Sequence, residues 1–207
     1  MNSISVIIPV KNGEDTLEAC LKSIDEQTIR SQIDILILDS CSTDKSCEIA
    51  KRFGATIINI PPGTFSHGGT RNTGAQYAKG SLLYYTVQDA KLSSPDMLEK
   101  MASHFTDMDV QAVNGIQGVP SEPDKNPAAW FQRFSKPMPE TRWFKDMSFS
   151  KLSPRQQLEF CRWDNVNAMY RKNALLAIPF RPVNFAEDAL WSLDALTNEY
   201  KLIRDSS

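Results

Sequence analysis

The sequence lacks the features that mark several large classes of protein. Its 23 basic and 25 acidic residues leave a formal net charge of −2, so no positive field favours nucleic acid as a partner. Its four cysteines contain no CxxC pair, and we expect reduced thiols in a cytoplasmic protein. It has no apolar run long enough to span a membrane. Its first residues carry neither a basic region nor a long apolar one, so we expect no secretory signal.

The sequence does contain a regular alternation of strand and helix patterns over its first 105 residues. Apolar runs, uncharged except for Asp34, predict buried strands at residues 4–10, 33–38, 55–60 and 82–87. After the first strand, Leu17, Cys20, Leu21 and Ile24 recur at helical spacing. This alternation predicts one domain built on a parallel sheet with helices on both faces.

Several residues predict where the other helices begin and end. Ser42 or Thr43 can cap a helix that stops before Gly54. A glycine-rich loop and short helix should occupy residues 68–80, and Pro95 should be the first residue of a further helix. Residues 185–201 should form a closing helix with three leucines turned inward, namely Leu190, Leu193 and Leu196.

Acidic residues stand at the ends of two predicted strands. Asp39 follows the second strand, and Asp89 follows the run "LLYYTVQ". In sheets of this kind, ligands bind outside the carboxyl ends of the strands. We therefore expect a ligand site at this edge, although Asp39 could instead cap the turn before Ser42.

Other polar signals also have a structural explanation. The segment "GTFSHGGT" nearly fits a phosphate-binding P-loop, but Gly69 stands where that motif needs lysine, so we expect a glycine-rich connection. His67 would then be an exposed loop residue. Glu187 and Asp188 could simply complement the dipole in the first turn of the closing helix.

Residues 120–155 have little periodicity and are rich in aromatic and basic residues. Three interpretations stay open: an internally packed loop, a surface that stacks on sugar faces, and a peripheral contact with an anionic membrane. The residues concerned are Trp130, Phe131, Phe134, Trp143 and Phe144, interleaved with Arg133, Lys136, Arg142 and Lys145.

Five segments together resemble the inverting family 2 glycosyltransferases. They are "SVIIPVKNGEDTLEACLKSI", "ILILDSCSTDKS", "HGGTRNTGAQYAKG", "QDA" and "FAEDALWS", in this order. The combination of "FSHGGTRNTGA" with "QDA" is most similar to the bacterial rhamnosyltransferase-type branch. The resemblance implies the glycosyltransferase type A fold, a Rossmann-like, mostly parallel sheet flanked by helices.

The same resemblance implies a division of labour along the chain. Residues 1–207 would form a single catalytic domain, with a nucleotide-sugar-binding half at 1–119 and an acceptor-side half at 120–207. Relatives usually continue beyond the helix that follows Glu187, so we expect part of the acceptor site to lie outside this sequence.

The resemblance assigns the first group of residues to the nucleotide. Pro9 and Val10, with the loop through Asn12 and Glu14, would form one wall of its pocket. Asp39 would accept a hydrogen bond from N3–H of a uracil or thymine ring, which suits an ionised carboxylate because it only accepts. The expected donor is therefore a UDP- or dTDP-sugar.

A second group would hold the diphosphate and its metal. Arg71 would approach the diphosphate with Asn72 beside it, and Gln88 and Asp89 would complete the nucleotide-sugar site. Asp89 would be the surviving acid of a D-x-D metal motif. One protein carboxylate can suffice for Mg²⁺ or Mn²⁺ when substrate phosphates supply the remaining oxygens.

The implied chemistry is a single displacement that inverts the anomeric carbon. Asp188 would be the catalytic base, with Glu187 as the alternative. The enzyme would be a metal-dependent hexosyltransferase, of the rhamnosyl type if the narrower resemblance holds. It would act at the inner face of a membrane, on a saccharide or lipid-linked acceptor, in cell-surface polysaccharide biosynthesis.

Two other functions stay open. A sugar-nucleotide-binding protein without transferase activity fits the lone acid of "QDA". A nucleotidyltransferase fits the sheet, although no phosphate loop follows the first strand.

Overall fold

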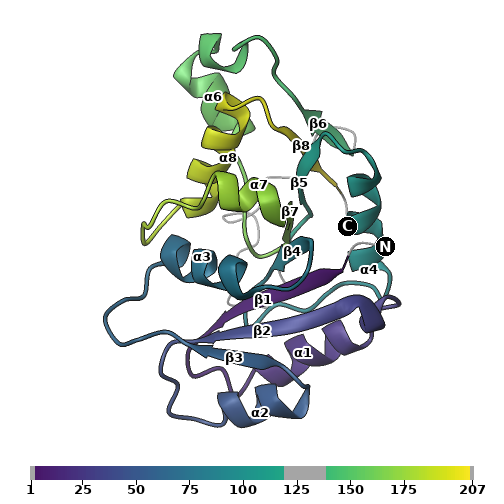
Figure 1. Cartoon of the computed structure of the whole chain (residues 1–207), viewed down its shortest axis with the longest axis vertical. Coiled ribbons are helices and arrows are strands. Elements are labelled where there is room, and N and C mark those ends of the chain that lie inside the picture. The colour runs from purple at the N-terminus through teal and green to yellow at the C-terminus, as the bar shows by residue number, and fades with distance from the viewer. Residues whose placement is uncertain (1–2, 119–138, 206–207) are drawn as a thin grey trace, which may run out of the picture.

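A mixed sheet of eight strands forms the centre of the computed structural model, which describes residues 3–118 and 139–205 (Figure 1). Among these residues the strand order is β3-β2-β1-β4-β7-β5-β8-β6. The strands are β1 (Ile4–Val10), β2 (Ile33–Asp39), β3 (Thr56–Asn59), β4 (Leu82–Tyr85), β5 (Val110–Asn114), β6 (Glu140–Arg142), β7 (Ala168–Arg171) and β8 (Lys201–Arg204).

Helices cover both faces of this sheet, as predicted (Figure 1). Along β1, Val6 and Ile8 pack in a core with Leu17 and Leu21 of α1, whereas Ile7 faces a second core that contains Trp191 of α8. This alternation follows from the two-residue period of a strand. The helices are α1 (Leu17–Asp25), α2 (Ser46–Arg52), α3 (His67–Tyr77), α4 (Met97–Ser103), α6 (Pro154–Phe160), α7 (Lys172–Ala177) and α8 (Glu187–Thr197), with short 3₁₀ turns at Arg30–Gln32, His104–Thr106 and Phe149–Lys151.

The direction of β7 decides which loops reach the ligand edge. Strands β1 to β4 pair in parallel, with Val10 opposite Asp39. Strand β7 is antiparallel to β4 and β5, and Ala168 lies opposite both Tyr85 and Asn114. The loop that enters β7 therefore lies at the same edge as the carboxyl ends of its neighbours.

Three predicted helix starts were wrong. Helix α2 begins at Ser46, because the backbone N–H of Ser42 turns back to Asp39 instead of opening a helix. Helix α4 begins at Met97, two residues after Pro95. Helix α3 begins at His67, because the Ser66 hydroxyl accepts a hydrogen bond from the Gly69 amide and caps it.

The closing helix is shorter than predicted. It ends at Thr197, and the chain continues into β8, a strand that the sequence pattern did not reveal. Leu196 is buried, but Leu190 and Leu193 are only partly covered. Trp191 instead fills the core, because its side chain is fully buried and its indole N–H donates to the Ile178 carbonyl at 2.8 Å.

The described part of the aromatic and basic segment packs internally. Phe144 meets Phe149 and Phe160 at ring distances of 5.2 and 4.9 Å. Trp143 donates to the Glu199 carbonyl, with Lys145 at 3.9 Å from its ring centre. Residues 119–138, with Trp130, Phe131, Phe134, Arg133 and Lys136, lie outside the described residues.

Candidate active site at the carboxyl edge of the sheet

The loop after β1 and the loop after β2 are locked together. The Asn12 amide donates to the Ser42 hydroxyl at 2.9 Å, and its side-chain oxygen accepts from the Thr43 amide at 2.9 Å. Asn12 has a φ of 46°, in the left-handed region that asparagine tolerates better than most residues. The side chain of Glu14 accepts from the Lys45 amide at 3.1 Å. These loops form a preorganised rim around the ends of both strands.

Asp39 lies inside this rim. It is 4% exposed, and its carboxylate accepts from the Ser42 amide at 3.2 Å. Pro9 and Val10, the last residues of β1, lie beside it in register with Leu38 and Asp39. The Ser42 contact agrees with the turn-capping interpretation, and an ionised carboxylate has further lone pairs for a ligand donor.

The segment after β4 places Gln88 and Asp89 next to the same rim. The Gln88 side chain accepts from the Lys11 amide at 2.9 Å and donates to the Lys11 carbonyl at 3.3 Å. It therefore ties β4 to the end of β1. Asp89 is exposed, and its carboxylate accepts no hydrogen bond within the described part of the chain.

The residues present fit a divalent ion that is held mainly by its substrate. Residues 3–118 and 139–205 contain no group of three or more metal-ligating side chains. The unengaged carboxylate of Asp89 can supply one hard oxygen ligand, while diphosphate and water would have to supply the others.

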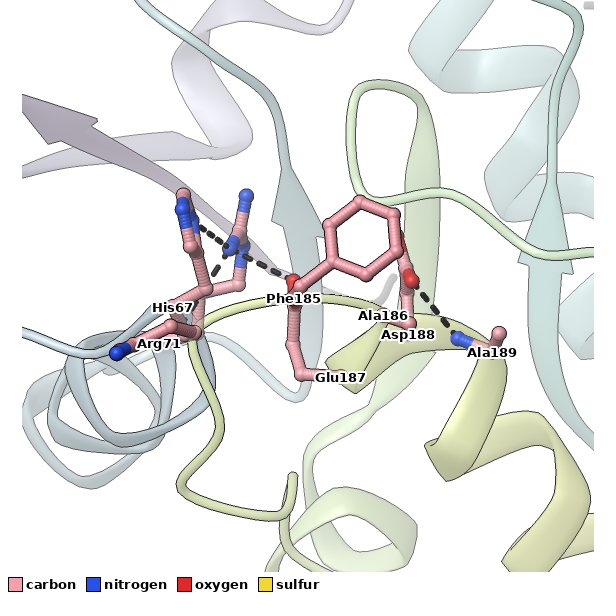
Figure 2. A pocket seen from close by; sticks show the side chains of 8 residues that line it. His67, Arg71, Phe185, Ala186, Glu187, Asp188 and Ala189 are labelled. Atoms are coloured by element: carbon pink, nitrogen blue, oxygen red, sulfur yellow. Dashed lines mark hydrogen bonds and ion pairs between the residues drawn. The ribbon is translucent and has the colours of Figure 1, made fainter.

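A second group of residues lines a pocket of about 400 Å³ between α3 and the start of α8 (Figure 2). His67 and Arg71 come from α3, and the chain entering α8 supplies the rest. The residues that line the pocket are His67, Arg71, Asn184, Phe185, Ala186, Glu187, Asp188 and Ala189. His67 is exposed, as predicted, although it belongs to a helix and not to a loop.

A buried ion pair forms the base of this pocket. Arg71 donates from Nη1 to Glu187 Oε1 at 2.8 Å, and both side chains are more than nine-tenths buried. The same carboxylate oxygen accepts from Asn165 Nδ2 at 3.2 Å. The Asn165 oxygen in turn accepts from the Tyr170 hydroxyl at 2.6 Å. Oε1 of Glu187 is therefore engaged by both a cation and an amide.

Asp188 has a different environment from its neighbour. Its two oxygens accept from the backbone amides of Asn165 at 3.2 Å and Ala189 at 2.8 Å. Burial first, and then the charge of Glu187, raise the pKa of Asp188 to about 6. A carboxylate with this pKa can take up a proton near neutral pH, as a general base must.

The structure engages Arg71 and Asn72 in contacts within the protein. Arg71 donates a hydrogen bond from Nη1 to Glu187, and its buried Nε has no hydrogen-bond partner. Asn72 donates to the Phe180 carbonyl at 2.8 Å and accepts from the Phe180 amide at 3.0 Å. The Asn72 amide is thus fully used in fixing the chain before α8.

Comparison with known proteins shows which family the sequence belongs to. The sequence profile of glycosyl transferase family 2 matches residues 5–178. The chain belongs to this family. The O-antigen chain rhamnosyltransferase WbaN of Salmonella anatum is 36% identical over 131 residues, which cover 62% of this chain and 41% of WbaN. The chain therefore spans about two fifths of that relative's length.

Solved structures confirm the type A glycosyltransferase fold. The mannosyltransferase PcManGT from Pyrobaculum calidifontis, in complex with GDP-Man and Mn²⁺, superimposes with a TM-score of 0.73 at 19% identity, covering 100% of this chain and 55% of PcManGT. S. aureus TarS 1–349 in complex with UDP-GlcNAc gives 0.72 at 19% identity, covering 99% of this chain and 56% of TarS.

Three residues near the site of this family 2 chain were given no functional role from the sequence. Asn165 contacts both adjacent acids through its backbone and side chain. Asp164, whose pKa is raised by burial, adds to the negative field at Asp188. Phe185 lines the pocket and is 86% exposed. A polar run before a strand, "RWDNVN", was the available signal for the first two.

Proposed function

We propose that the chain is the donor- and base-bearing part of an inverting glycosyltransferase. It moves a sugar from a UDP- or dTDP-sugar to a saccharide or lipid-linked acceptor in cell-surface polysaccharide biosynthesis. The observation that carries this proposal is Asp188, a half-buried acid with a pKa of about 6 at the mouth of a pocket. Membership of family 2 and the O-antigen relative support the reaction class.

The base acts on the acceptor. Asp188, once ionised, accepts the proton of an acceptor hydroxyl, and the oxygen attacks the anomeric carbon opposite the departing diphosphate. The two backbone amides on its oxygens keep the carboxylate oriented without neutralising its charge. Proton transfer by a positioned base contributes about 10²- to 10⁴-fold to the rate. Glu187 is the poorer candidate, because Arg71 and Asn165 occupy it.

The donor binds at the ends of β1 and β2, at the carboxyl edge of the sheet. Asp39 accepts a hydrogen bond from N3–H of a pyrimidine ring. Pro9 and Val10 form one wall of the pocket for this ring, and the loop contacts of Asn12 and Glu14 keep that wall in place. The burial of Asp39 supports this role, because a desolvated carboxylate discriminates strongly between a donor and an acceptor on the ring edge.

Asp89 is the residue that would hold a divalent ion, Mg²⁺ or Mn²⁺, when the donor is bound. The ion would stabilise negative charge on the leaving diphosphate. The exposed carboxylate and the Mn²⁺ in a solved protein of the same fold support this part of the proposal. Gln88 acts beside it by fixing the loop after β1. Arg71 and Asn72 have no part in this donor site, because Arg71 is paired with Glu187 and Asn72 binds the backbone of Phe180.

The position in the cell and the lipid contact stay part of the proposal. The described residues form no helix that is long and apolar enough to cross a membrane. The cytoplasmic location and the peripheral membrane contact expected from the sequence are retained as expectations. The division of the chain into a nucleotide-sugar-binding half at 1–119 and an acceptor-side half at 120–207 also stays an expectation.

Calorimetric titration with UDP, dTDP, GDP and ADP, each with and without Mn²⁺, tests the donor assignment. We expect UDP or dTDP to bind at least tenfold more tightly than the purine nucleotides, and Mn²⁺ to strengthen that binding. Equal affinity for all four would exclude the role of Asp39. Donor binding without any sugar release to acceptors would favour a binding protein that lacks transferase activity.

A further inference from the structure

A well-anchored loop joins α7 to α8. The Asn72 side chain binds both backbone groups of Phe180, at 2.8 and 3.0 Å. Gly68 of α3 touches the loop where no side chain fits, because a Cβ there would clash with the carbonyl oxygen of Arg181. Arg181 itself pairs with Asp194 of α8 at 2.6 Å. Contacts to two helices therefore fix the course of this loop.

At its end this rigid loop presents an aromatic ring to water. Phe185 is 86% exposed, the largest exposed fraction of any large hydrophobic side chain in the described part of the molecule. Ala186, with a φ of 59°, turns the chain into α8 and leaves the Phe185 ring beside Asp188 (Figure 2). A fixed backbone with an uncovered ring is a preorganised contact surface, because little order remains to be gained on binding.

The charges around the ring restrict what can bind there. The cation of Arg71 is matched by Glu187 at 2.8 Å, so it offers no net positive charge to a ligand. Asp188 adds a further carboxylate at the mouth of the pocket. An anionic group would therefore be repelled, whereas hydroxyl groups could bind the carboxylate, the Asn184 amide or the His67 ring.

We propose that Phe185 is the platform on which an uncharged sugar ring of the acceptor stacks, with Asn184 and His67 binding its hydroxyl groups. A pyranose has an apolar C–H face and a polar rim, which matches one aromatic face surrounded by planar polar groups. A ring seated there places a hydroxyl group next to Asp188. This inference rests on the proposed transferase function and names the acceptor class.

Ligand-observed NMR titration of the full chain with bound UDP tests the platform. The probes are methyl glycosides of neutral hexoses and 6-deoxyhexoses, with methyl glucuronide as the charged comparison. Wild type should bind a neutral glycoside more tightly than the glucuronide. Phe185→Ala should weaken that binding about three- to tenfold, whereas Phe185→Trp should preserve it. Tyr77→Ala is the matched control, because Tyr77 is an exposed aromatic residue of α3 that does not line the pocket.

Calorimetry with UDP on the same variants tests the donor site separately from the Phe185 platform. UDP should bind wild type and Phe185→Ala equally. If UDP binds but no neutral glycoside does, or if Phe185→Ala binds glycosides as wild type does, the platform is refuted and the donor assignment stands. If UDP fails to bind wild type, both fail together.

Discussion

Replacing Arg71 by methionine should cost the fold far more than an exposed ion pair of the same length. The Arg71–Glu187 pair has an N···O distance of 2.8 Å, with side chains 6% and 7% exposed. The Lys100–Asp96 pair has the same distance, with side chains 59% and 43% exposed. The two pairs differ mainly in burial, so Lys100→Met is a matched control.

The magnitude follows from what Arg71→Met leaves behind. Methionine fills much of the same volume, but the Glu187 carboxylate stays buried with only the Asn165 amide to stabilise its charge. Removing one partner of a buried pair costs about 3–5 kcal/mol. The remaining amide puts our expectation near the lower limit, about 3 kcal/mol. Lys100→Met should cost far less, because water and salt screen an exposed pair.

Urea denaturation of wild type and both variants measures the difference. The double variant Arg71→Met with Glu187→Gln should recover a large part of the loss, because glutamine stays a neutral acceptor for Asn165. The slope of the unfolding free energy against urea should not change. A loss below about 1 kcal/mol for Arg71→Met, with an unchanged slope, would refute the idea that this pair is an essential buried charge pair.

Four further outcomes test the proposed reaction. Asp188→Asn should abolish turnover with unchanged UDP affinity, measured by sugar transfer and calorimetry, since it removes only the base. The transfer rate of wild type should rise with pH through about 6 and then level off, because Asp188 must be ionised to accept a proton; a rate that falls over this range would contradict that role. Asp39→Ala should weaken UDP binding by about 1.5–3 kcal/mol, the range for hydrogen bonds to charged groups. Asp89→Ala should remove the Mn²⁺ dependence of donor binding and leave the unfolding free energy unchanged; an unaltered Mn²⁺ response would show that another group holds the ion.

The position of Asp39 and Asp89 at one edge of the sheet could be predicted from the sequence because it depends on local patterns. Strands β1, β2 and β4 are buried on both faces and read as apolar runs, which only one charge, Asp34 of β2, interrupts. The residues that follow such runs lie at one edge, so Asp39 and Asp89 could be placed together. Strand β8 was missed because its pattern is weak: two buried apolar residues stand between two partly exposed basic ones.

The contacts of the acidic pair could not be predicted in the same way. Arg71 and Glu187 are 116 positions apart, and no local pattern joins them. Asn165 was missed for a topological reason. It precedes β7, and the residues before a strand lie at the ligand edge only when that strand runs against its neighbours, which its four-residue pattern does not reveal.

The reversed strand also explains how two adjacent acids acquire different roles. Successive residues of a helix point about 100° apart, so Glu187 and Asp188 cannot face the same surroundings. The loop before β7 meets both: Asn165 gives its side-chain amide to Glu187 and its backbone amide to Asp188. Only Glu187 also receives a cation, from Arg71. Neutral amides alone hold the oxygens of Asp188, and its burial and the charge of Glu187 raise its pKa to about 6. The two acids therefore differ in which one Arg71 contacts, and on this difference we propose Asp188 as the base.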